Sequence, residues 1–91
     1  MTNPLCPARE TRLYVDTDTV PGYIVTATAC WWTHDLWEAP HFRIEVSRAD
    51  GGTLWVETLP AGTSPKDAEA VGLMLLRVNA AGDVRQMGRA A

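Results

Sequence analysis

The chain has 91 residues, which allows one hydrophobic core and excludes a second domain of ordinary size. Hydrophobic residues make up 46% of it and charged residues 21%, a composition typical of folded proteins and unlike that of disordered ones. The formal net charge is -3, and no Lys or Arg occurs between Leu13 and Phe42, so this part of the chain lacks the basic clusters that bind nucleic acid.

Residues 1–11 carry prolines and mixed charge without periodicity, and we expect an irregular lead-in there. They show neither the basic start nor the apolar stretch of a secretory signal, and no apolar run approaches the ~20 residues of a membrane span. We therefore expect a cytoplasmic protein that does not span a membrane. Cys6 and Cys30 should be reduced there, and the sequence leaves open whether they interact.

Alternation of polar and apolar residues predicts four strands. They are separated by the turn-forming residues 16–22, by a loop over residues 33–40 and by Asp50-Gly51-Gly52, a signature of tight hairpins. The expected strands cover residues 12–16, 23–32, 41–48 and 53–59.

Successive side chains along a strand point to opposite faces of a sheet. In the second strand Ala27 and Ala29 share one face, and such small side chains leave room for a helix to lie across it. In the third and fourth strands the residues expected to point inward are Phe42, Ile44, Val46, Leu54 and Val56.

A helix start is predicted at Ser64-Pro65-Lys66-Asp67, which combines a capping Ser, a Pro at the first helical position and an acid in the first turn. We expect the helix to run to about Ala80 and to end at Gly82, with a loose tail over residues 83–91. Helical spacing predicts that the face covering the sheet consists of Ala68, Val71, Gly72, Leu75 and Val78.

These elements predict one α+β domain over residues 12–82. Its architecture is an antiparallel sheet of three or four strands packed on a single C-terminal helix, in the order ββββα.

Three of the four tryptophans lie between Trp31 and Trp37. Because adjacent residues in a strand face opposite sides, Trp31 and Trp32 cannot both enter one core, and one of them should be at least partly exposed. The alternation places an aromatic cluster with an arginine on the outer sheet face, a combination typical of binding hot spots: Tyr14, Trp32, Arg43 and Trp55. Contact with another molecule, or burial under another segment of the same chain, would each account for it.

Two cysteines and two histidines supply the residue types that ligate zinc, namely Cys6, Cys30, His34 and His41. Only Cys30 and His34 are close in sequence, whereas zinc ligands usually come as close pairs, so we expect no metal and no other cofactor. No nucleophile elbow, phosphate-binding glycine loop or paired carboxylates accompany the histidines, and we expect no enzymatic activity.

The order of the strands and the Ser-capped last helix is similar to the C-terminal part of double-stranded-RNA-binding domains. That family carries a cluster of lysines on the first turn of this helix, facing phosphates. The matching stretch here is Pro65-Lys66-Asp67-Ala68-Glu69, with one Lys and two acids. The resemblance is therefore one of topology and does not imply RNA binding.

A second resemblance falls within residues 54–82, where segment 55–59 reads WVETL and segment 64–76 reads SPKDAEAVGLMLL. These segments resemble small orphan proteins of GC-rich bacteria and their phages or mobile elements, in which hairpins precede a helix that opens on a Ser/Thr-Pro-x-Asp/Glu-Ala phrase. The resemblance implies a small accessory protein that acts by binding, such as an anti-CRISPR-like inhibitor of a host defence complex.

We therefore expect a non-enzymatic protein-binding module whose acidic, Trp-rich surface contacts a protein partner with a basic surface. The residues expected to bind that partner are Trp32, Asp35, Trp37, Glu38, Trp55 and Arg43. A structural homodimer is an alternative, favoured by apolar residues on the helix flanks, Leu73, Met74 and Leu76. A nucleic-acid-binding domain is less favoured, since its support is limited to Arg77, Arg85 and Arg89.

Overall fold

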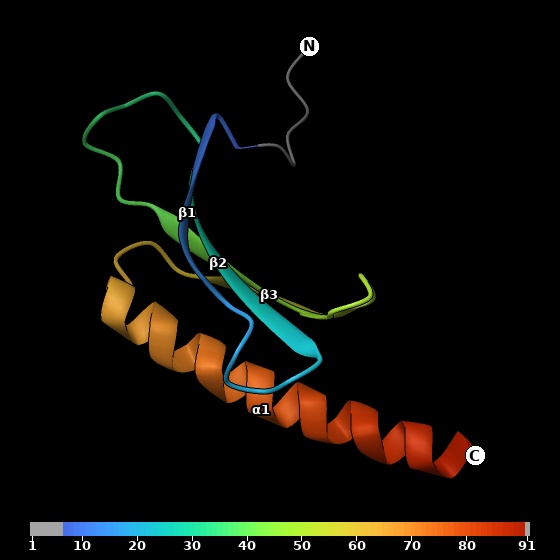
Figure 1. Cartoon of the computed structure of the whole chain (residues 1–91). Helices are drawn as coiled ribbons and strands as arrows, with labels where there is room; N and C mark the ends of the chain where they lie inside the picture. Colours follow the sequence, from blue (N-terminus) through green and yellow to red (C-terminus); the bar gives the residue numbers. More distant parts are fainter. Residues whose placement is uncertain (1–6, 91) are drawn as a thin grey trace.

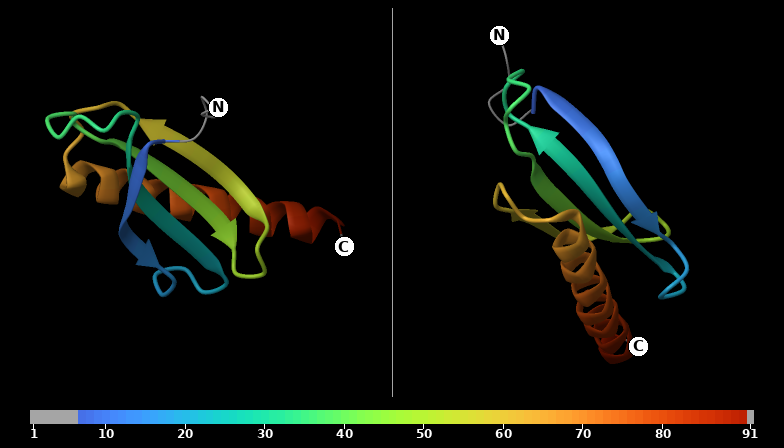
Figure 2. Two further views of the ribbon diagram at one scale, coloured as in Figure 1. Left: turned by 90° about the horizontal axis from the view of Figure 1, so that it is seen from above. Right: turned by 90° about the vertical axis from the view of Figure 1, so that its left-hand side faces the viewer.

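A computed structural model describes residues 7–90 of the chain, the last three of them by their backbone alone. Four strands form one antiparallel sheet in chain order, and a single long helix lies across one face of it (Figures 1 and 2). The architecture is therefore α+β with the order ββββα, as the sequence predicts. The elements are β1 (Arg9–Asp16), β2 (Tyr23–Trp31), β3 (His41–Arg48), β4 (Thr53–Leu59) and α1 (Pro65–Ala90).

The hydrophobic core lies between the two central strands and the helix. On the sheet side it contains alternate residues of β2 and β3, and on the helix side Ala68 and Leu76. Ala27 and Ala29 are buried beneath α1, which confirms that these small side chains leave room for the helix. The sheet residues of the core are Val25, Ala27, Ala29, Phe42, Ile44 and Val46.

Two irregularities in strand pairing decide which side chains face the helix. The register shifts between Arg12 and Tyr14, so Tyr14 pairs with Ala27 and lies on the helix side of β1. A second register shift, between Val46 and Ser47, places Trp55 on the helix side of β4. The predictions that Tyr14 and Trp55 point outward and Val56 inward are therefore wrong, because an extra residue in a strand turns every following side chain to the other face.

The start of α1 is as predicted, since the backbone N–H of Asp67 donates to the Ser64 hydroxyl at 3.0 Å. Its end is not, because the helix continues through Gly82 to Ala90 where a loose tail was predicted. Gly82 keeps an ordinary helical backbone and does not adopt the positive φ of a helix-ending glycine. Asp83, one residue later, is bonded to the sheet through Arg48 and Tyr23 and so holds this part of the helix in place.

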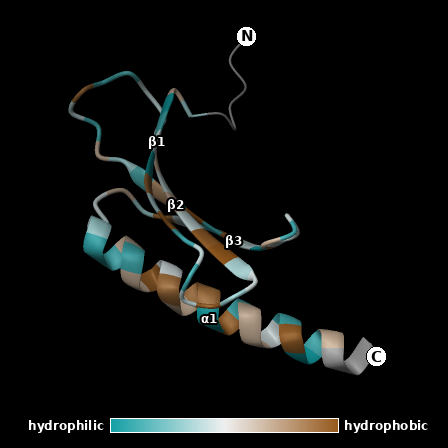
Figure 3. Ribbon diagram, in the orientation of Figure 1, coloured by the Kyte–Doolittle hydropathy of each residue, from teal (hydrophilic) through white to brown (hydrophobic). Residues whose placement is uncertain are grey.

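Ala68 and Gly72 of the predicted helix face are buried and Leu75 packs against the core, but the buried face also includes residues outside the prediction. Leu76 and Ala80 are fully buried, whereas Val78, predicted to face the sheet, is exposed. Leu73 packs against the core, which leaves Met74 as the exposed member of the three residues that favoured a homodimer. Figure 3 shows the hydrophobic residues gathered along the middle of the helix and polar residues in its first turns.

The N-terminal prediction is wrong for residues 9–11, which belong to β1. Cys6 and the rest of residues 1–6 lie outside the described residues, as does any contact between Cys6 and Cys30. Among the described helices, none combines the length and the apolar character that a membrane crossing requires.

Candidate protein-binding surface

The loop that joins β2 to β3 carries two of the exposed tryptophans and projects beyond the end of the sheet (Figures 1 and 2). We call residues 32–40 the Trp loop. It contains four of the residues expected to bind a partner: Trp32, Asp35, Trp37 and Glu38.

The Trp loop is fixed at its base by Trp31, the last residue of β2. The indole N–H of Trp31 donates to the backbone carbonyl of Glu38 at 3.1 Å, which ties the two ends of the loop together. The Arg9 guanidinium lies 4.2 Å from the centroid of the Trp31 ring, in a cation–π contact. Trp31 is therefore a half-buried anchor, and its neighbour Trp32 is the more exposed of the pair, as the alternation predicts.

Two acidic side chains hold the loop in shape from within. The Asp35 carboxylate accepts a hydrogen bond from the backbone N–H of Trp37 at 2.9 Å, and the Asp35 carbonyl accepts one from Glu38 N–H at 3.2 Å. The Glu38 carboxylate accepts the N–H of Thr33 at 3.1 Å, across the loop. Asp35 and Glu38 thus have a structural role that the sequence did not indicate, and each uses one carboxylate oxygen for it.

The tip of this internally bonded loop is apolar. Leu36 is 80% exposed and Trp37 94% exposed, so the two large side chains extend into solvent. Trp32, at the start of the loop, is 44% exposed, and its ring centroid lies 6.1 Å from that of His41 in an edge-to-face arrangement. A loop stabilised by hydrogen bonds therefore holds Leu36 and Trp37 in water, where neither contributes to the core of the described chain.

The remaining expected binding residues do not join this surface. Trp55 is 46% exposed, lies on the helix side of β4 and lines a groove with Val78 and Gly82 of α1. Arg43 lies on the outer sheet face, where its guanidinium pairs with Glu10 at 2.9 Å. The predicted single cluster of aromatic residues around Arg43 is therefore split between the Trp loop, the outer sheet face and the helix side.

A partly buried polar group between the sheet and α1, centred on the buried Asp83, was not predictable from the sequence. The Asp83 carboxylate accepts two hydrogen bonds from Arg48 and one from the Tyr23 hydroxyl, the last at 2.7 Å. Arg48, and to a lesser degree Tyr23, lower the pKa of Asp83, and the carboxylate in turn raises the pKa of Tyr23. All three members have partners, so the group is suited to holding α1 in place rather than to acid–base chemistry.

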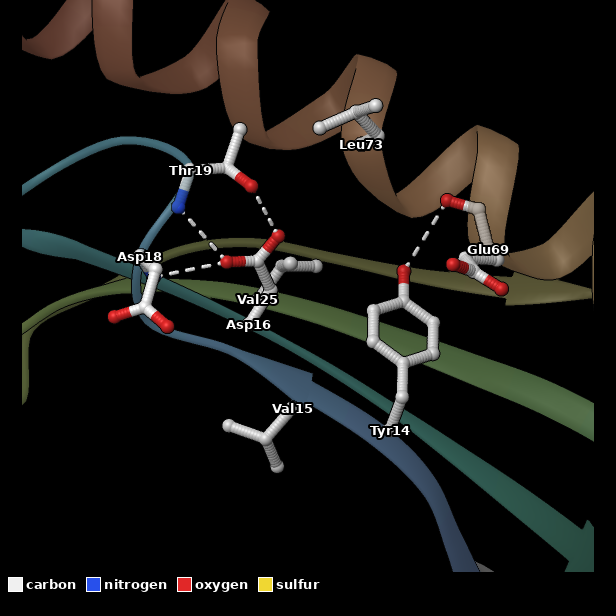
Figure 4. A pocket seen from close by; sticks show the side chains of 8 residues that line it. All are labelled: Tyr14, Val15, Asp16, Asp18, Thr19, Val25, Glu69 and Leu73. Carbon is white, nitrogen blue, oxygen red and sulfur yellow. Dashed lines mark hydrogen bonds between the residues drawn. The ribbon is translucent and has the colours of Figure 1, made fainter.

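An acidic groove lies between the β1–β2 loop and the first half of α1 (Figure 4). Its volume is about 520 Å³. The Tyr14 hydroxyl donates to the Glu69 carbonyl at 3.3 Å, and burial raises the pKa of Tyr14. Hydrogen bonds from Thr19 and Asp18 lower the pKa of Asp16, so its charge is already matched by the loop's own donors.

The described residues offer little for metal binding. They contain no group of three or more His, Cys, Asp or Glu side chains arranged to hold a metal ion. Cys30 is a buried thiol with no disulfide partner among the described residues, and burial raises its pKa, which disfavours the thiolate form that metals bind. His34 is exposed in the Trp loop, whereas His41 pairs with Cys30 at the ends of β3 and β2.

Comparisons with known proteins return no relatives: no protein-family model, no curated protein and no solved structure matches the chain.

Proposed function

We propose that this chain is a non-enzymatic protein-binding module that inserts the tip of the Trp loop, Leu36 and Trp37, into an apolar pocket of a partner protein. The observation that carries the proposal is the 94% exposure of Trp37 on a loop held by its own hydrogen bonds. Tryptophan is among the residues most enriched at binding hot spots. A loop that is already ordered loses little conformational entropy when it binds.

The charges around the tip support a partner with a basic rim around its pocket. Asp35 and Glu38 flank Leu36 and Trp37, and each has a carboxylate oxygen that accepts no hydrogen bond from the described residues. The whole chain carries a net charge of -3, which favours encounter with a positively charged surface. An anti-CRISPR-like inhibitor of a host defence complex would act in this way, and that role is part of the proposal through the resemblance of the hairpin-plus-helix segment.

The test is capture of partner proteins from an extract of the native host on the immobilised chain, quantified by mass spectrometry. Replacing Trp37 by Ala should weaken capture of a specific partner by tenfold or more, since truncating a central tryptophan commonly costs about 2 kcal/mol or more. Met74→Ala is the matched control. Met74 is also a large, exposed apolar residue, but it lies on α1, outside the Trp loop. Partners that bind the wild type, Trp37→Ala and Met74→Ala variants equally would contradict the proposal.

A structural homodimer through the helix flanks has less support. Of its three residues, Leu76 is fully buried and Leu73 packs on the core, so both already contribute to folding. The nucleic-acid-binding alternative is based on Arg77, Arg85 and Arg89. Arg77 and Arg85 are exposed on α1, and the side chain of Arg89 lies outside the described residues.

A further inference from the structure

A third groove lies at the end of the sheet opposite the Trp loop. Tyr23 begins β2 at this groove and Trp31 ends β2 at the loop, so the two sites are about 26 Å apart along the strand. The groove lies between the β1–β2 loop and the C-terminal half of α1, and its volume is about 510 Å³. It is lined by Val20, Pro21, Tyr23, Arg77, Ala80, Ala81, Val84 and Arg85.

The lining of this groove is mostly apolar and contains two arginines. Val84, which is exposed, and Pro21 of the β1–β2 loop both line it. Arg77 and Arg85 also line it, and no carboxylate of the described residues forms an ion pair with either guanidinium. A ligand that suits this groove therefore has a bulky apolar group flanked by negative charges.

The Trp loop of the same chain has this composition. Leu36 and Trp37 supply the apolar group, and Asp35 and Glu38 supply carboxylates on either side of it. The free oxygens of these carboxylates, Oδ2 of Asp35 and Oε1 of Glu38, accept no hydrogen bond within the described chain. The groove also has room for the tip, because its volume falls in the ~300–1,000 Å³ range of pockets that enclose small organic ligands.

From this complementarity we infer that the groove receives the Trp loop of a second copy of this chain, with Trp37 on Val84 and the acidic residues near Arg77 and Arg85. Loop and groove lie at opposite ends of β2, so one molecule cannot satisfy its own groove and the contact runs head to tail. A head-to-tail pair still has one unoccupied loop at one end and one unoccupied groove at the other. Further chains can therefore add until the assembly closes into a ring. The inference rests on the proposed function, because it names one partner for the same loop.

A loop-in-groove contact is small, and such interfaces are weak and transient. Sedimentation velocity should therefore be measured up to about 1 mM, above the dissociation constant expected of so small an interface. We expect the mean mass of the wild type to rise with concentration. Added salt should reverse the rise, because the flanking charges are exposed and screened.

Two variants separate the two halves of the contact. Trp37→Ala removes the loop tip and keeps the groove, whereas Val84→Asp places a charge in the groove and keeps the loop; both side chains are exposed, so folding should be unchanged. Each variant alone should remain monomeric at concentrations where the wild type assembles. Their mixture should form dimers and nothing larger, since one member offers a loop and the other a groove. Met74→Ala should assemble like the wild type.

A wild type that stays monomeric, a Val84→Asp variant that assembles normally, or a mixture that forms no dimer would each overturn the inference. If the wild type stays monomeric but captures another protein in a Trp37-dependent way, self-association is overturned and the proposed function stands. If the wild type neither self-associates nor captures any protein through Trp37, both the inference and the proposed function are overturned.

Discussion

At the scale of single residues, Gly72 is a point of close approach between sheet and helix. A Cβ atom at this position would overlap the Tyr14 hydroxyl, with the Cζ atom of Tyr14 at 3.2 Å and Val25 Cγ2 at 3.5 Å. Tyr14 reaches this place because the irregularity in β1 turns it toward the helix. The absence of a side chain at Gly72 is therefore what lets α1 lie against β1 and β2.

This contact predicts opposite effects for two glycines of one helix. Gly72→Ala should lower the free energy of unfolding by about 1–3 kcal/mol, the usual cost of overpacking a tight contact. Gly82→Ala should raise it by up to about 1 kcal/mol, because a Cβ there meets nothing within 4 Å and Ala favours the helix. Denaturant titration measures both changes.

In a Tyr14→Phe background the cost of Gly72→Ala should shrink, since the overlapping oxygen is gone. Equal costs in the two backgrounds would show that Tyr14 does not set the spacing.

At the scale of elements, strands and helix were predictable because their signals are local. Alternation marks the strands, and Ser64 and Pro65 mark the helix start. The faces of β1 and β4 were not predictable, because an extra residue in a pairing leaves no local mark. In β4, Trp55 and Leu59 face the helix side, and Val56, which faces away from it, is just as apolar. The end of α1 depends on contacts from Arg48 to Asp83, which are distant in the sequence.

The ion pair of Asp83 makes a prediction about pH. Arg48 and then Tyr23 lower the pKa of the folded Asp83 carboxyl, so its contribution to stability is present above the unfolded value of about 3.9 and is lost as pH falls through the folded value. Asp83→Asn should be less stable than the wild type near neutral pH, and its stability should fall less steeply below about pH 4. Urea midpoints across this range measure both effects. Identical acid dependence in the two proteins would contradict a role for Asp83 in holding α1.

At the scale of the whole molecule, two candidate binding sites lie at opposite ends of β2, the Trp loop and the groove lined by Val84. The sequence indicated the first of them. The alternation of strand residues predicted an exposed tryptophan between Trp31 and Trp37, and Trp32 and Trp37 are exposed, whereas the role of this region in binding stays a prediction. The two grooves between the β1–β2 loop and α1 were not predictable, because these segments are about fifty residues or more apart and only the fold brings them together. The irregular pairing of β3 with β4 turns Trp55 to the helix side, away from the Trp loop.

The central claim is that Trp37 extends into solvent from an ordered loop and is covered when a partner binds. Fluorine NMR of the chain labelled with fluorinated tryptophan tests this directly, because each of the four tryptophans gives its own resonance, assigned by single Trp→Phe variants. In dilute free protein the Trp37 resonance should show the largest solvent isotope shift, and partner binding should abolish that shift while leaving Trp31 unchanged. A Trp37 resonance already shielded from solvent in the monomer, or one unaffected in a complex, would contradict the account.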